Sequence, residues 1–355
     1  MATTSYAVWN NKGGVGKSTI TFHIACRYAE LNPNKNVLVI DLCPQANSSM
    51  MLLGGGVVGE EHVLNLCTQA VPRTVVGYLS TVLTNGHGAP LPNPLQYILP
   101  VHQANPAIPH NLGLLSGDGN LEPMAPAISQ QANNIPLVPA FHPWVWVHLI
   151  FKRFIDSVAQ ATPQRDLTVF IDTNPSFSIY TELAVSAAER LIVPVNADDS
   201  SRVATNALFA LLHGQVPPHP VYGRWTFASN AQLHGVPVPQ IHTIVGNRLT
   251  QYAGAAGAFS ALSDATADTL FNEYRINPHY FTPRQIAAGN VGMFRTLYSV
   301  ALRDFNTAGV VAAHLGRPLS NLPGGHYPVY NTQIQVNADR VAECERAVDQ
   351  VVAML

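Results

Sequence analysis

Residues 10–19 read NNKGGVGKST, a stretch that holds three glycines and two of the four lysines of the chain. The apolar run Tyr6–Trp9 directly before it predicts a strand. After it, apolar residues recur at i, i+4, i+8 and i+11 from Ile20 to Leu31, which predicts a helix with one buried face. A glycine-rich turn between a strand and a helix offers backbone N–H groups and the positive end of a helix dipole to an anion. The stretch therefore predicts a phosphate-binding loop in an α/β fold.

This loop departs from the ordinary pattern G-x-x-x-x-G-K-[ST], because Asn11 stands at its first glycine and Lys12 follows. Glycines let the backbone close around phosphate oxygens without Cβ clashes. Lys17 is expected to reach the β- and γ-phosphates, and the hydroxyl of Ser18 to bind Mg²⁺. The residues expected to hold the nucleotide phosphates are Gly13, Gly14, Val15, Gly16, Lys17, Ser18 and Thr19.

Several further apolar runs end in a polar residue, as buried parallel strands do. They are Val37–Ile40 before Asp41, Leu167–Ile171 before Asp172, Leu191–Val195 before Asn196, and Thr243–Val245 before Asn247. Alternating strands and helices predict a doubly wound, mostly parallel β-sheet flanked by helices. Ligands of such sheets bind at the carboxyl ends of the strands, which is where the loop also lies.

The polar residues at this edge suit specific roles in a nucleotide site. Asp172 is expected to hold Mg²⁺ through water, together with Ser18. Asp41 is expected to orient the water that attacks the γ-phosphate. The amide of Asn247 offers a donor and an acceptor, which fits the edge of an adenine base.

Composition limits the classes of function. The chain has 355 residues, 47% of them hydrophobic, so that it can bury a large core. Only 11% of the residues are charged and the net charge is −2, which excludes a polycation and leaves nucleic-acid contacts to a local basic patch. The four cysteines show neither pairing nor zinc spacing, and no signal peptide or long apolar run is visible. We therefore expect a soluble cytoplasmic protein.

The sequence predicts one domain over residues 1–355 with two elaborations. The stretches at about 80–135 and 213–240 are rich in proline and lack a clear period, and we expect ordered surface insertions there. An apolar stripe near the end of the chain predicts a helix over about 338–354, with Asn337 or Asp339 as its N-cap.

Four motifs together, KGGVGKST, VLVIDLCPQAN, VFIDTNPS and TIVGNRL, closely resemble the ParA/MinD group of deviant-Walker ATPases, and ParA more than MinD. The resemblance implies a P-loop NTPase of the SIMIBI type that uses ATP/ADP and Mg²⁺ and hydrolyses ATP weakly until a partner stimulates it. It also implies an ATP-sandwich homodimer in which Lys12 reaches the phosphates of the partner subunit, so that Lys12, Lys17 and Asp41 are the catalytic residues. Two positions depart from the family pattern: Cys43 replaces an aspartate and Asn174 a proline.

By this resemblance, the expected function is segregation or positioning of a cargo: a plasmid, a chromosome locus or a protein assembly. A ParB-like or adaptor protein would stimulate hydrolysis, and the ATP-bound dimer would bind DNA nonspecifically and associate with the nucleoid. The candidate DNA contacts are Arg275, Arg284, Arg295, Arg303 and Arg317. The alternative is a MinD-like ATPase at a membrane surface, against which the acidic balance of the last helix argues, so that no membrane partner is expected. An iron–sulfur ATPase needs cysteines that bridge the dimer, and a tyrosine-kinase relative needs a terminal cluster of tyrosines. This sequence has neither, so we do not expect either class.

Overall fold

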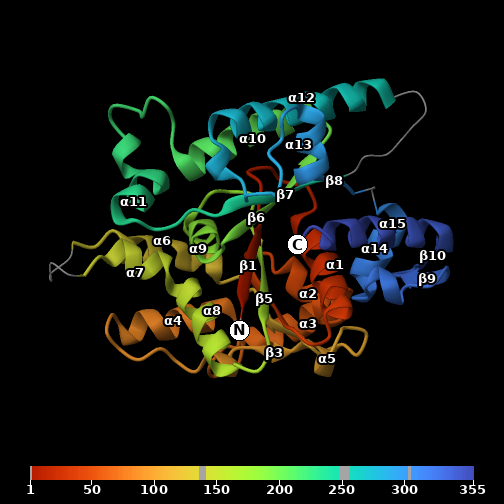
Figure 1. The fold of residues 1–355 in the computed structure, drawn as a ribbon. Coiled ribbons are helices and arrows are strands. Elements are labelled where there is room, and N and C mark those ends of the chain that lie inside the picture. The colour runs from red at the N-terminus through yellow and green to blue at the C-terminus, as the bar shows by residue number, and fades with distance from the viewer. Residues whose placement is uncertain (1, 136–140, 248–255, 303–304) are drawn as a thin grey trace.

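The computed structural model describes residues 2–135, 141–247, 256–302 and 305–355 (Figure 1). Eight strands form one sheet in the order β3-β4-β2-β5-β1-β6-β7-β8, and every neighbouring pair is parallel except β3 with β4. The strands are β1 (Thr3–Val8), β2 (Asn36–Leu42), β3 (Leu99–Pro100), β4 (Leu112–Leu115), β5 (Leu167–Thr173), β6 (Arg190–Asn196), β7 (Gln240–Asn247) and β8 (Ser299–Ala301). The predicted doubly wound sheet is confirmed.

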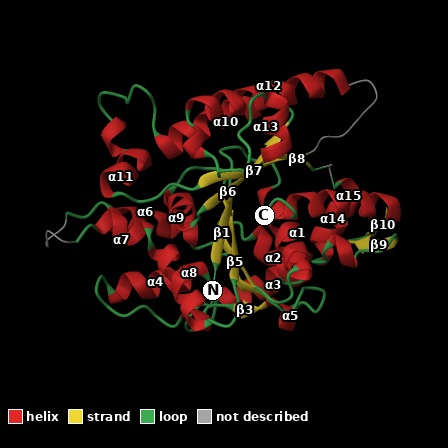
Figure 2. Cartoon of the chain, in the orientation of Figure 1, coloured by secondary structure: helices red, strands yellow, loops and turns green. Residues whose placement is uncertain are grey.

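Helices cover both faces of the sheet (Figure 2). One face carries α1 (Lys17–Leu31), α2 (Asn47–Leu52), α3 (Gly56–Cys67), α5 (Val101–Ala104), α14 (Asn306–Leu315) and α15 (Ala338–Val352). The other carries α4 (Val75–Asn85), α6 (Leu121–Ala132), α7 (Pro143–His148), α8 (Ile150–Ala161), α9 (Ile179–Ala187), α10 (Asp199–His213), α11 (Phe227–His234), α12 (Ala256–Ile276) and α13 (Val291–Tyr298). Alternate residues of the central strands enter the two cores, as the pleat of a sheet covered on both sides requires.

The register of the sheet gathers the polar strand ends at one edge. Asp41 at the end of β2 lies beside Asp172 at the end of β5. Strand β1 is the next neighbour of β5, and the loop that follows it leaves the sheet at the same edge. On the other side of β1, Asn196 of β6 pairs with Asn247 of β7. The fold therefore brings the predicted site residues together.

The segment 80–135 is not confined to the surface. It contains β4, whose residues are largely buried and pair with β2 inside the sheet. The strand has only four residues and stands between proline-rich turns, too short a run for its period to be visible in the sequence. The segment 213–240 contains α11, which buries Phe227 and Ala231 in the core, while the loop before it leaves Val216 and Trp225 exposed.

The C-terminal helix α15 follows the prediction closely. The side chain of Asn337 accepts hydrogen bonds from the backbone N–H groups of Asp339 and Arg340, so Asn337 is the N-cap. The apolar face of the helix, from Val341 to Val352, is buried against the core that contains α1. Among the helices that the structure describes, none is both long enough and apolar enough to cross a lipid bilayer.

Candidate active site

The glycine-rich loop between β1 and α1 needs glycine at two positions with left-handed backbone. Gly14 has φ of 70°, and Gly16 has φ of 82° and is the N-cap residue of α1. A Cβ on Gly16 would lie 2.4 Å from Nδ2 of Asn247, whereas a Cβ on Gly13 or Gly14 would meet nothing within 4 Å. The loop thus leaves open space at Gly13 and Gly14, next to the N-terminus of a fifteen-residue helix, a geometry that suits a phosphate group.

Lys17 is folded back over this loop. Its side chain is buried, and its Nζ donates hydrogen bonds to the carbonyl oxygens of Lys12 at 2.8 Å and Asn10 at 3.4 Å. Burial lowers the pKa of Lys17 to about 8, against the opposing charge of Asp172. The ammonium is therefore fixed inside the loop, where an anionic phosphate group would compensate for its lost hydration.

Asp41 and Asp172 form a pair of buried carboxylates. Both side chains are fully buried. Burial and then the charge of Asp41 raise the pKa of Asp172 to about 7, and burial also raises the pKa of Asp41. Oδ2 of Asp172 is buried without a hydrogen-bond partner among the described residues. Two adjacent carboxylates with an unpaired oxygen fit a hard cation such as Mg²⁺, which takes oxygen ligands.

The described side chains at this edge are too few to bind a metal ion by themselves. The described residues contain no cluster of three or more His, Cys, Asp or Glu side chains that could hold a metal ion. Ser18, the other residue expected to bind Mg²⁺, lies beside Asp172 at the start of α1. Mg²⁺ held by one or two protein oxygens would complete its shell with phosphate oxygens and water.

Asp41 also organises the turn that leads into α2. Its Oδ1 accepts a hydrogen bond from the backbone of Cys43 at 3.1 Å, and its Oδ2 accepts from the backbone N–H and the hydroxyl of Ser49 at 3.0 and 2.7 Å. The hydroxyl of Ser49 accepts in turn from the N–H of Gly117 at 2.9 Å. Sequence reasoning missed Ser49, because a serine in a polar stretch carries no signal before the turn is seen.

The two departures from the family pattern have local explanations. The thiol of Cys43 donates to Oε1 of Gln45 at 2.8 Å, inside the turn after β2. Oδ1 of Asn174 accepts from the backbone of Ser176 at 3.2 Å, and its amide lies 3.4 Å from the hydroxyl of Tyr180. Such an Asx turn fixes the backbone after the strand by hydrogen bonds, where a proline would do so through its ring.

A pocket of about 560 Å³ opens above the loop. The phosphate-loop residues from Gly14 to Thr19, except Val15, line one end, and Cys43, Gln45 and Asn47 line the turn beside it. The other end lies between α2, α3, the end of α14 and the hairpin of β9 (Gly325–Val329) and β10 (Thr332–Val336). Its size suits a nucleotide, since sites for small ligands measure roughly 300–1,000 Å³.

Asn247 contacts the phosphate loop and is not one of the residues that line the pocket. Its Nδ2 donates to the carbonyl oxygen of Val15 at 2.8 Å. Val15 itself is fully buried, so its part in the site is through its backbone. The expected contact between Asn247 and a base stays a prediction.

Lys12 forms an ion pair within its own chain. Its Nζ contacts both carboxylate oxygens of Asp198 and lies 3.3 Å from the hydroxyl of Ser201. The side chain of Lys12 is 16% exposed and that of Asp198 41% exposed, so the pair lies at the surface beside the loop. Sequence reasoning missed Asp198, since it sits in an ordinary helix-capping position before α10.

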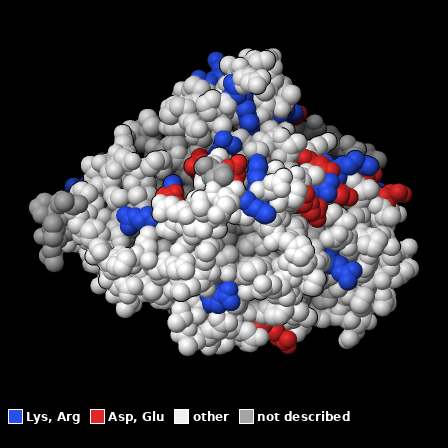
Figure 3. All heavy atoms as spheres, turned by 60° about the horizontal axis from the view of Figure 1, so that its bottom comes forward, with Lys and Arg blue, Asp and Glu red and all other residues white. Residues whose placement is uncertain are grey.

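The five candidate arginines do not form one patch. Arg275 is exposed at the end of α12, and Arg317 is exposed after α14 on the other face of the sheet. Arg284 is half-buried, donates to the carbonyl oxygen of His242 at 2.6 Å and lies over the ring of Tyr298. Arg303 lies outside the described residues. The face in Figure 3 likewise shows basic side chains in small groups between acidic and uncharged ones.

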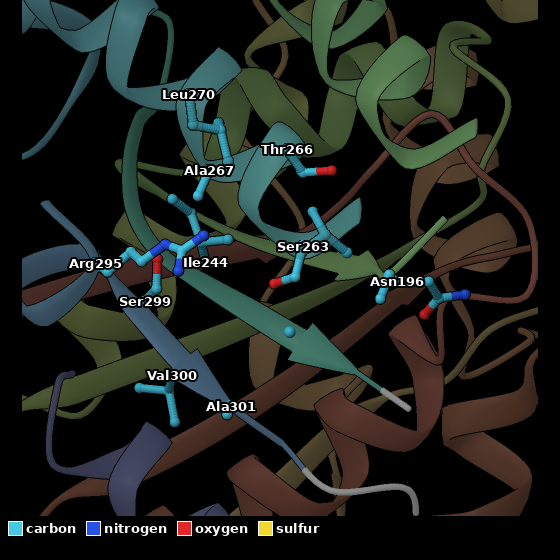
Figure 4. Close-up of a pocket in the computed structure, with 13 residues that line it drawn as sticks. Asn196, Ile244, Ser263, Thr266, Ala267, Leu270, Arg295, Ser299, Val300 and Ala301 are labelled. Carbon is cyan, nitrogen blue, oxygen red and sulfur yellow. The ribbon is translucent and has the colours of Figure 1, made fainter. Parts of the chain in front are cut away.

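Arg295 points into a second cavity of about 260 Å³, on the α12 side of the sheet (Figure 4). Its guanidinium forms an ion pair with Asp264 of α12. Ile244 of β7 and Ser299 of β8 also line this cavity, next to the arginine (Figure 4). Arg284 and Arg295 thus have partners within the chain, although the Arg295 side chain is still 38% exposed, and Arg275 and Arg317 are the more exposed residues among the described candidates.

Residues 3–85 match the family model of an AAA domain. No curated protein sequence matches the chain. Among solved structures, apo McdA from Cyanothece is similar over 99% of both chains, with 13% identity and a TM-score of 0.57. The ATP complex of a McdA variant from Cyanothece has 14% identity and a TM-score of 0.58 over 99% of this chain and 96% of that chain.

A protein from Borrelia burgdorferi assigned to plasmid partition and bound to AMPPNP is also similar. It has 14% identity and a TM-score of 0.50, over 99% of both chains. At such identities the likeness shows a shared fold alone. Together with the family match over residues 3–85, it confirms the resemblance to the ParA/MinD group that the motifs indicated.

Proposed function

We propose that this chain is a ParA-like ATPase that binds ATP with Mg²⁺, pairs with a second copy of itself and positions a cargo. The observation that carries this proposal is the pair of buried carboxylates, Asp41 and Asp172, beside Lys17 at a pocket of nucleotide size. The neighbours that were solved with ATP or AMPPNP share this fold, which supports the choice of nucleotide.

Each residue of the site has a role in this proposal. The backbone N–H groups of the loop from Gly13 to Thr19 bind the phosphates, and Lys17 neutralises their charge. Ser18 and Asp172 hold Mg²⁺, which when bound neutralises charge on the phosphate oxygens. Asp41 fixes the turn before α2 and orients the attacking water at the end of β2. Hydrolysis in a single subunit is weak, and a partner protein stimulates it.

In the proposed dimer, Lys12 acts on the nucleotide of the partner subunit. Lys12 lies on the loop, where its carbonyl oxygen accepts from Lys17, and its ammonium pairs with Asp198 of the same chain. When two subunits face each other, Lys12 exchanges Asp198 for the phosphates of the partner subunit, as an arginine finger supplied in trans does. ATP occupancy then controls association.

The proposed cycle also needs a surface that the ATP-bound dimer binds and a partner protein that releases it. We propose that the ATP-bound dimer binds DNA nonspecifically at the nucleoid and that a ParB-like or adaptor protein releases it by stimulating hydrolysis. Arg275 and Arg317 are the exposed candidates for the phosphate backbone. A twofold dimer presents two copies of each, so the footprint would be built across the pair.

The membrane alternative finds no support in the last helix. A membrane-binding helix needs an apolar face that is free to enter the interface. In α15 that face, from Val341 to Val352, is packed into the core on the α1 side of the sheet. Arg27 of α1 also pairs with Asp349 and Glu345 on the polar side of α15, which ties the helix to the domain.

The test combines turnover and DNA binding in one set of samples. Purified protein is assayed for phosphate release with ATP and Mg²⁺, and for binding to random-sequence duplex DNA with ATP, ADP or no nucleotide at low and physiological salt. The proposal expects slow turnover and DNA affinity in the ATP state alone, weakened by salt and by Arg275→Ala. Absence of turnover would contradict the proposed ATPase activity. Equal DNA affinity in all nucleotide states would contradict the proposal that the ATP-bound dimer uses DNA as the surface on which it acts.

A further inference from the structure

A pocket of about 210 Å³ lies on the face of the sheet opposite α1, and it shares no lining residue with the nucleotide pocket. Its walls are the C-terminal end of α4, the loop 86–92 that follows this helix, and parts of α7 and α8. These three helices lie together on the side of the sheet away from α1 (Figure 1). We call it the α4–α8 pocket. The function proposed above assigns it no role.

The charge of the α4–α8 pocket is that of Arg153 on α8. Among the described residues that line the pocket, Arg153 alone is a Lys, Arg, Asp or Glu. Its guanidinium is half-buried and has no ion pair or hydrogen bond with the described residues, while Asp156, one turn further on, pairs with Lys152. Burial lowers the pKa of Arg153, and only the phenol of Tyr78 opposes this. An anion in the pocket would compensate the guanidinium for its lost hydration.

The loop after α4 adds neutral hydrogen-bond donors. Gly86 and Gly88 have φ of 79° and 91°, and a Cβ on either would meet nothing within 4 Å. The backbone N–H groups of His87, Gly88 and Ala89 donate to no other backbone group in the described part of the chain. Open N–H groups on a glycine turn are a common binding element for anions. The loop therefore complements the guanidinium on the opposite wall.

The remaining wall of the α4–α8 pocket is apolar. Val82 of α4 and Trp146 of α7 are buried side chains that line it, and Pro90, Leu91 and Pro92 close it from the loop. One cation, neutral donors and an apolar wall suit a monoanion with an apolar body. A dianion such as a phosphate monoester would keep one charge without a partner, because residues 62–117 supply no further cation to this pocket.

We infer that the α4–α8 pocket binds a carboxylate carried on an apolar group about the size of one large side chain. Arg153 pairs with the carboxylate, the open N–H groups of the loop donate to it, and Trp146 packs against the apolar body. Two sources offer this chemistry, namely a free carboxylic acid and the C-terminal residue of a peptide. The inference is independent of the proposed function, because no residue of this pocket takes part in nucleotide binding.

The test compares two probes of the same shape that differ in charge. The wild type is titrated with 3-phenylpropionate and with 3-phenylpropanamide, and the indole N–H resonance of Trp146, assigned by its loss in Trp146→Phe, is followed by NMR. We expect the acid to shift this resonance to saturation and the amide to bind at least tenfold more weakly, since it lacks the charge. An acid that leaves the resonance in place, or an amide that binds equally well, overturns the inference.

Variants of α8 test the part played by the guanidinium. Arg153→Gln removes the charge and should weaken the binding of 3-phenylpropionate by tenfold or more while leaving the amide as it is. Arg153→Lys keeps a positive charge without the planar fork and should lie between the two. Lys152→Gln, which breaks the exposed pair with Asp156, is the matched control and should bind both probes as the wild type does. Unchanged binding of the acid in Arg153→Gln overturns the inference.

A peptide distinguishes the two sources of the carboxylate. N-acetyl-alanyl-phenylalanine and its C-terminal amide are titrated in the same way. Binding of the peptide acid at least tenfold tighter than that of 3-phenylpropionate assigns the pocket to a protein C-terminus, and equal or weaker binding assigns it to a free acid. In both cases the affinity must fall in Arg153→Gln. A peptide acid that binds this variant as it binds the wild type overturns the carboxylate site.

Discussion

The ammonium of Lys12 is bound by the carboxylate of Asp198, a residue 186 positions further along the same chain. Burial alone would raise the pKa of Asp198, but hydrogen bonds from Lys12, Ser200 and Ser201 outweigh it and lower the pKa to about 2. Asp198 also caps α10 by accepting from the backbone N–H of Ser201 at 2.8 Å. In the monomer, Lys12, which the proposed dimer needs for the phosphates of the partner subunit, is thus bound by Asp198 of its own chain.

Release of this ion pair should favour the dimer. Asp198→Asn keeps a helix cap and removes the charge that competes for Lys12. Since one partner is 41% exposed, the pair is worth about 1 kcal/mol at most, or about fivefold per subunit. We expect the ATP-dependent dimer to form at lower protein concentration, measured by sedimentation equilibrium. Asp199→Asn, the exposed neighbour, is the matched control, and a weaker dimer in Asp198→Asn would show that Asp198 supports the interface.

Lys17→Ala should abolish nucleotide binding. The variant removes the buried ammonium that the loop holds over its carbonyl groups, and no other lysine or arginine among the described residues lines the pocket. We expect at least a hundredfold loss of ATP affinity by calorimetry, because a charged hydrogen-bond donor to phosphate is lost in a buried place. Lys152→Ala, which breaks an exposed pair with Asp156, is the control. ATP binding that survives Lys17→Ala would remove Lys17 from the site.

Two variants of Asp41 should separate its chemical role from its structural one. Asp41→Asn retains an oxygen that can accept from Ser49, so ATP binding should persist while hydrolysis falls by a hundredfold or more. Asp41→Ala also removes three hydrogen bonds from the turn and should lower the free energy of unfolding by about 1–3 kcal/mol. Phosphate release and urea unfolding measure the two effects. Normal turnover in Asp41→Asn would disprove the catalytic assignment.

Asp172 should make the stability of the nucleotide-free protein depend on pH. Its folded pKa of about 7 lies above the unfolded value of 3.8, so the folded state binds more protons between these values. Stability from this group is therefore present at low pH and is lost as pH rises from about 4 to 7, by up to about 1.4 kcal/mol per pH unit. We expect Asp172→Asn to remove this loss and to abolish the effect of Mg²⁺ on ATP binding.

The contribution of Asp172 is measured as the difference in the free energy of unfolding between the wild type and Asp172→Asn, because other groups titrate in the same pH range. Burial lowers the pKa of His213 and of His242 to about 4, so these residues add stability as pH rises. Urea unfolding of the wild type and of Asp172→Asn across this range cancels their contribution. The free energy of unfolding of Asp172→Asn should rise relative to that of the wild type as pH rises. The free energy of unfolding of Asp268→Asn, which changes an exposed carboxylate on α12, should follow the wild-type curve at a constant offset. Parallel curves for Asp172→Asn would refute the raised pKa.

The central strands and the phosphate loop could be predicted from the sequence because their signals are local. The runs before Asp41 and Asp172 are apolar, and glycine spacing at Gly14 and Gly16 reports a backbone that other residues avoid. The carboxyl ends of parallel strands share one edge, so the pairing of Asp41 with Asp172 followed from the order of elements.

Contacts between distant segments could not be predicted in this way. Asp198 meets Lys12, and Tyr330 meets His314, only after the sheet and the hairpin are formed. The strand β4 was hidden in a proline-rich stretch because its four residues show no period. Arg284 and Arg295 carry the same charge in the sequence as Arg275, and only packing shows that they contact His242 and Asp264. Side-chain partners are a property of the fold.

The most direct test of the account is the mass of the protein with ATP. Asp41→Asn, which should bind ATP without hydrolysing it, is examined by sedimentation velocity with Mg²⁺ and ATP, ADP or no nucleotide, alone and combined with Lys12→Ala. The account predicts a dimer with ATP alone, and a monomer that still binds ATP when Lys12 is removed. A protein that stays monomeric with ATP bound, or a dimer that persists without Lys12, would contradict it.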